Sequence, residues 1–149
     1  MTIRNTSIEL AILLAVVMAG PGRNNESLDQ LIARAESARI EDRPALCTEI
    51  AQRELDSAGQ LYQAAKPEEA RVAVENVVAY SDKARDASIR TGKRLKDTEI
   101  AMRKMAARLR DIKRNLAFED QAPVATAVDR LEQMRTELLS HMFGKKDNK

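Results

Sequence analysis

The sequence predicts an all-α protein, an elongated antiparallel bundle of about four helices built on one long central helix. Apolar or small residues recur every three or four positions, and no segment shows a sustained alternation of period two. Aliphatic residues, Met and Ala supply most of the 44% hydrophobic content, whereas aromatic residues make up only 3%. Most of these residue types favour helices and suit the core of a helical bundle.

The central helix is predicted over about 50 residues between Pro67 and Pro123, a stretch with no proline and one glycine, Gly92. A seam of apolar or small residues follows it with alternating spacings of three and four, the period of helices that pack lengthwise. The seam consists of Val74, Val77, Ser81, Ala84, Ser88, Thr91, Leu95, Thr98, Met102, Met105, Leu109, Ile112 and Leu116. The phase of the seam is unchanged across Gly92, and glycine costs a helix only about 1 kcal/mol relative to alanine. We therefore expect one continuous helix, with at most a bend at Gly92.

Shorter helices are expected over 27–40, 44–65 and 123–142, within a single helical domain over 21–143 that is followed by a polar tail, 144–149. Each predicted helix begins at residues that suit an N-terminus, since Asn and Ser cap helices and proline is accepted in a first turn. These residues are Asn25 or Ser27, Pro44, Pro67 and Pro123.

The N-terminus resembles a secretory signal. Arg4 precedes an apolar run, Leu10–Ala19, that ends in Gly20-Pro21-Gly22. A positive start, a short apolar stretch and small residues for cleavage are the three parts of such a signal, and the run is too short to span a bilayer. We expect cleavage after Ala19 or Gly20, with residues 1–20 removed and the protein periplasmic or secreted. The alternatives are a buried core helix or a membrane-interfacial segment.

The sequence contains no recognisable catalytic or metal-binding motif. One cysteine, Cys47, and one histidine, His141, lie far apart, whereas metal sites need three or four clustered ligands. Cys47 falls on the apolar line of the second predicted helix and is expected to be buried. A glycine-rich phosphate loop, a nucleophile elbow and a pair of Glu-x-x-His motifs are all missing. We therefore expect no enzyme activity and no cofactor.

The second half of the central helix is expected to lack a sufficient partner within the chain. Only the last helix is placed to cover it, and a two-helix hairpin buries little apolar surface. The exposed stripe would comprise Leu95, Met102, Met105, Leu109 and Ile112. These residues predict self-association or contact with another protein.

A basic segment accompanies this stripe. Between Arg90 and Arg114 there are ten basic and three acidic residues, a net charge of +7. The candidate anion-binding residues are Arg94, Lys96, Arg103, Arg108 and Arg110. Such a surface attracts anionic partners. The alternative is a solvated helix face whose charge is balanced within the fold, for example by the stretch Glu26–Asp56 with its net charge of −4.

Together these features predict an exported, non-enzymatic helical protein of the scaffold or adaptor type that binds another protein or itself. The alternative function is binding of an anionic ligand or polymer, such as an acidic lipid, a cell-envelope polymer or nucleic acid, through residues 90–114. Nucleic acid is the least favoured, because strand binding usually requires aromatic side chains and the basic segment has none before Phe118.

Overall fold

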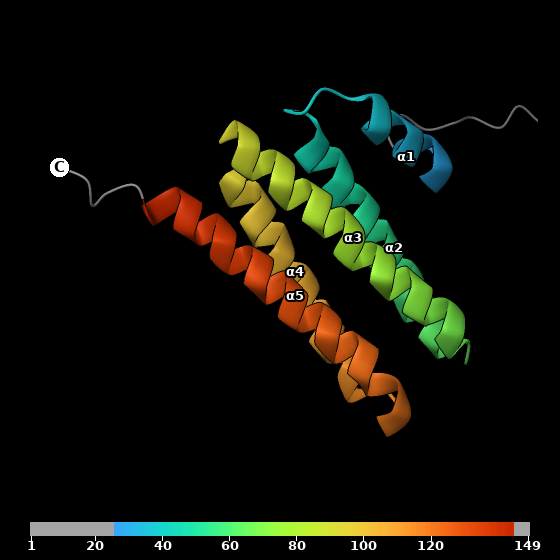
Figure 1. The fold of residues 1–149 in the computed structure, drawn as a ribbon. Coiled ribbons are helices and arrows are strands. Elements are labelled where there is room, and N and C mark those ends of the chain that lie inside the picture. The colour runs from blue at the N-terminus through green and yellow to red at the C-terminus, as the bar shows by residue number, and fades with distance from the viewer. Residues whose placement is uncertain (1–25, 145–149) are drawn as a thin grey trace, which may run out of the picture.

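The protein is an all-helical bundle, as the sequence predicts. The computed structural model describes residues 26–144, and the predicted signal over 1–20 and the tail residues 145–149 lie outside them. The described part contains five helices and no strand (Figure 1): α1 (Leu28–Ser37), α2 (Arg43–Gln63), α3 (Pro67–Thr91), α4 (Leu95–Arg114) and α5 (Phe118–Phe143).

The four long helices form two antiparallel hairpins that lie lengthwise against each other (Figure 1). Helix α2 pairs with α3, and α4 pairs with α5. Between the hairpins, α3 packs beside α5 and α2 packs beside α4, while α1 packs against α2. Every long helix therefore has at least two neighbours that bury its apolar side.

The predicted continuous helix between Pro67 and Pro123 is wrong, because the chain turns back at Gly92–Arg94. Gly92 has a φ of +67°, and Arg94 also adopts a left-handed conformation with a φ of +56°. A left-handed residue just after a helix ends it, and glycine takes that conformation without steric cost. Across the turn, the hydroxyls of Ser88 and Thr98 lie 2.8 Å apart in a buried hydrogen bond. The small, polar middle of the seam thus joins α3 to α4.

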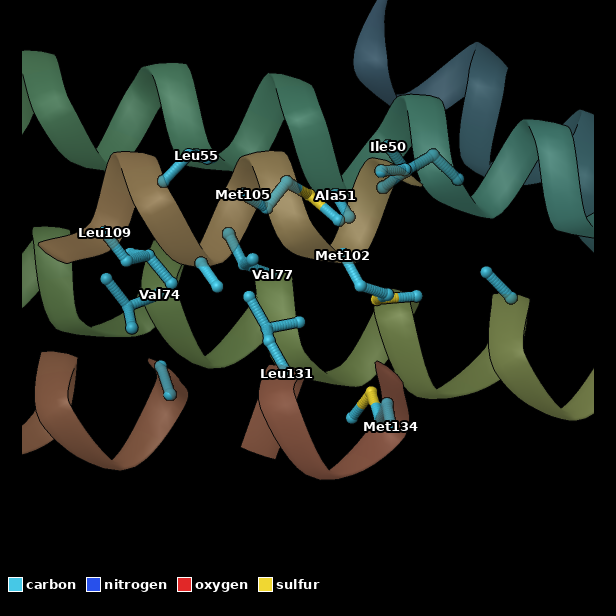
Figure 2. Close-up of a cluster of buried hydrophobic side chains, with 14 of the residues drawn as sticks. Ile50, Ala51, Leu55, Val74, Val77, Met102, Met105, Leu109, Leu131 and Met134 are labelled. Atoms are coloured by element: carbon cyan, nitrogen blue, oxygen red, sulfur yellow. The ribbon is translucent and has the colours of Figure 1, made fainter. Parts of the chain in front are cut away.

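One hydrophobic core runs between the hairpins (Figure 2). Its large members point toward one another from all four long helices: Ile50, Leu55, Val74, Val77, Met102, Met105, Leu109, Leu131 and Met134. Burial of each aliphatic or Met side chain stabilises the fold by about 1.5–3 kcal/mol. Leu31 of α1 is also fully buried, which attaches this short helix to the bundle.

Local signals account for some helix ends and not for others. Ser27 caps α1 in a capping box, with its Oγ accepting from the Gln30 backbone N–H at 3.2 Å. Pro67 begins α3, as predicted. The last helix begins at Phe118 instead of Pro123, which lies inside α5. Pro123 is the sixth residue of α5, beyond the first turn, so the helix extends backward past it at the cost of the one hydrogen bond that its missing N–H would make.

Replacing Gly92 by alanine should destabilise the protein by about 1–2 kcal/mol, because alanine must enter the left-handed region. If the chain formed one continuous helix here, the same substitution would instead stabilise the protein by about 1 kcal/mol. Urea unfolding followed by circular dichroism measures the difference. Gly92→Asn should lose less stability than the alanine variant, because asparagine tolerates a positive φ better. An alanine variant more stable than the wild type would contradict the turn.

Glu54 of α2 should make the stability depend on pH. Its side chain is buried against α3, and burial raises its pKa although Asn76 donates a hydrogen bond to Oε1 at 3.1 Å. Because the folded state holds this proton more tightly than the unfolded state, ionisation of Glu54 at neutral pH opposes folding. Glu54→Gln should therefore be more stable than the wild type at pH 7. The gain should shrink as the pH falls from the raised pKa of Glu54 to the ordinary glutamate pKa, below which both states are protonated, and an equal gain at pH 3 would argue against this explanation.

Candidate functional site

The apolar residues predicted to contact a partner lie in the protein's own core. Met102, Met105 and Leu109 are 0–2% exposed, and Leu95 and Ile112 are half-buried. The turn at Gly92 brings α3 and α2 over them in addition to α5. The prediction that these five side chains form an exposed stripe is therefore wrong. Self-association remains a prediction, but the apolar stripe no longer supports it.

The acids within the basic segment are all engaged with cations. Glu99, which is 7% exposed, accepts from Arg135 Nε of α5 at 2.5 Å. Asp97 lies 3.9 Å from Arg94, and Asp111 pairs with Arg114. None of these three carboxylates is left to neutralise the remaining cations of the segment.

Helix α5 neutralises one further cation. Arg110 Nη2 donates to Glu132 Oε1 at 2.8 Å, and this hydrogen bond is the main reason that the pKa of Glu132 lies below its ordinary value. Arg135 also contacts Glu132, at 3.4 Å. The polar network therefore ties α4 to α5, and it holds Arg110 in a structural role. The predicted balance by Glu26–Asp56 is not found in the described residues, because the ion pairs of that stretch join it only to its own arginines.

Seven cations between Arg90 and Arg114 have no carboxylate oxygen within 4.0 Å among residues 26–144. Arg90 lies on α3, and the other six, on the turn and α4, are here called the basic face: Lys93, Lys96, Arg103, Lys104, Arg108 and Lys113. All of the basic face is exposed except the half-buried Lys113. Of the five predicted anion-binding residues, Lys96, Arg103 and Arg108 thus belong to it, whereas Arg94 and Arg110 are paired.

The basic face covers both edges of α4. Arg110 marks the edge toward α5, and Arg103 and Lys96 precede it by one and two heptads on that edge. Arg108 and Ile112 mark the edge toward α2, where they line a cavity of about 250 Å³ beside Gly59. Positive charge therefore flanks the helix on either side of its buried seam, and a bound partner would meet it across the whole outer surface of α4.

Cys47 is buried, as predicted, with 3% of its surface exposed. Burial raises the pKa of the thiol, and the opposing charges of Lys83 and Arg43 do not overcome this effect. Neither cation was part of the prediction for Cys47. Arg43 lies one helical turn before Cys47 and was visible in the sequence, whereas Lys83 reaches the thiol only because α3 packs on α2.

The described residues offer neither a metal cluster nor a membrane span. Within residues 26–144, no three His, Cys, Asp or Glu side chains gather as metal ligands would. No helix in the same range is both long enough and apolar enough to cross a bilayer. Comparison of the chain with protein-family models, curated protein sequences and solved structures gives no match.

Cys47 should be an unreactive thiol in the native protein. Because it is buried and its pKa is raised, alkylation by iodoacetamide at pH 8 should be at least about a hundredfold slower than for a free cysteine. Mass spectrometry of timed samples measures the rate. Addition of 6 M guanidinium should restore the free-thiol rate, and fast alkylation without denaturant would identify an accessible, activated cysteine instead.

Proposed function

We propose that this protein acts by binding an anionic partner through the basic face of α4, and that it has no catalytic activity of its own. The observation that carries the proposal is the set of six cations on the turn and α4 without carboxylate partners among the described residues. Charged groups on a solvated helix are usually balanced by neighbours of opposite sign. Here the local acids are already engaged by Arg94, Arg114 and Arg135.

An acidic protein surface is the partner that the spacing favours. Lys96 and Arg103 lie seven residues apart on one edge of α4, about 10.5 Å along the helix axis. Cations at heptad spacing beside a packing seam commonly pair with glutamates of a second helix. This supports a scaffold or adaptor role, in which α4 accepts an acidic helix of another protein or of another copy.

An anionic polymer or lipid surface is the second candidate. It is favoured by the cations on both edges of α4 that have no carboxylate partner within residues 26–144, since a polyanion contacts charge wherever it is dense and does not require a register. The proposed setting for either partner is the periplasm or the cell exterior, on the basis of the apolar run Leu10–Ala19.

Reversing two charges of the basic face should weaken binding to anionic probes by about tenfold or more. The test variant is Arg103→Glu with Lys104→Glu. Probes are a glutamate-rich helical peptide, heparin and phosphatidylglycerol vesicles, each titrated at two salt concentrations. Preference for the peptide supports the protein partner, and preference for heparin or vesicles supports the second candidate.

The matched control is Arg39→Glu with Lys66→Glu, which changes the net charge equally at exposed positions outside the basic face. Its affinities should stay within about threefold of the wild type, because screened charges far from the contact act weakly. Equal losses in the two variants, or no salt-dependent binding to any probe, would contradict a role for the basic face.

A further inference from the structure

A second surface feature lies away from α4, in a cavity of about 330 Å³ between the end of α1, the start of α2 and the second half of α3. Its apolar wall includes Ala35, Cys47 and Ala87, which are each 3–5% exposed, together with the half-buried Ile40. Because its raised pKa keeps the Cys47 thiol protonated at neutral pH, this wall carries no charge. The volume falls at the lower end of the range for small-molecule pockets.

Three cations line the same cavity, and none has a carboxylate oxygen within 4.0 Å among residues 26–144. They are Arg43, Lys83 and Arg90. Arg43 is held in place by the turn after α1, since its Nε donates to the Ala38 carbonyl at 3.1 Å and its Nη2 to the Glu36 carbonyl at 3.4 Å. Lys83 Nζ lies 4.7 Å from the centre of the Tyr80 ring. These contacts position Arg43 and Lys83, and neither contact brings a carboxylate of residues 26–144 to the cation.

The acids around the cavity do not balance these cations. Asp86 is engaged by Arg85, whose Nη2 lies 3.1 Å from Asp86 Oδ1. Glu36 is the other acidic side chain at the cavity, and its carboxylate has no ion-pair partner in the described part of the chain. Three cations against the two carboxylates of the lining, Glu36 and Asp86, leave the cavity with a net charge of +1. A cationic site with an apolar wall is suited to a ligand that carries both a negative group and an apolar body.

We propose that the cavity between α1, α2 and α3 binds a small amphipathic anion, with its carboxylate among Arg43, Lys83 and Arg90 and its apolar body against Ala35 and Ala87. A ligand without the negative group would leave the cations unmatched. A ligand without the apolar body would leave the wall in contact with water. The site is independent of the basic face, because it uses α1, α2 and α3 and no residue of α4.

The test is an NMR titration of the full-length, ¹⁵N-labelled protein with sodium 2-naphthoate. The amide signals of Cys47 and Ala87 should shift and saturate with one dissociation constant. Arg90→Glu should weaken this binding by about tenfold or more, as loss of a charge-assisted contact does. The uncharged analogue 2-naphthamide should bind at least about tenfold more weakly than naphthoate to the wild type.

Lys66→Glu is the matched control, because it makes the same change in net charge at an exposed position that lines neither the cavity nor the basic face. It should keep the wild-type affinity for naphthoate. Three results would overturn the proposal: equal losses in the two variants, equal binding of naphthamide and naphthoate, or shifts confined to residues away from the cavity. Circular dichroism melts of both variants confirm that each is folded under the titration conditions.

Discussion

The left-handed turn at Gly92–Arg94 is the constraint on which the rest of this structure depends. Two residues with positive φ reverse the chain within three positions and send α4 back along α3. In one continuous helix, half of this long apolar seam would be exposed. Because of the reversal, the seams of α3 and α4 both face the same core. Met102, Met105 and Leu109 are buried for this reason, and the two hairpins close around them as one bundle.

Burial of the seam changes which surfaces are left for a partner. With the apolar stripe enclosed, the accessible features of α4 are its charges, and these are unevenly compensated. Helix α5 supplies Glu132 to Arg110, and Glu99 turns inward to Arg135. The cations of the basic face lie on both edges of the helix, with no carboxylate partner among residues 26–144. The recognition proposed for α4 therefore rests on electrostatics, whereas the apolar seam of this helix stabilises the fold.

Candidate sites were only partly predictable for the same reason. The local excess of basic residues was visible in the sequence, and so was the apolar position of Cys47. Whether a given cation is free was not visible, because its partner lies on another helix: Arg110 meets Glu132 and Arg85 meets Glu137 across a helix interface. The cavity beside Cys47 was hidden as well, since Lys83 and Arg90 come to it from α3, well along the chain from Arg43.

The sequence by itself determined the helical class, the start of α3 at Pro67 and the apolar seam of each helix, and it narrowed the first cap to Asn25 or Ser27, because these follow from local propensity and from the 3.6-residue period. Only the tertiary structure decided that the chain reverses at Gly92. The spacing of apolar residues is the same on both sides of the turn, since α3 and α4 face a common core, so periodicity alone did not distinguish one helix from two. The free energy gained by burying both seams together favours the chain reversal at Gly92–Arg94 over one continuous helix.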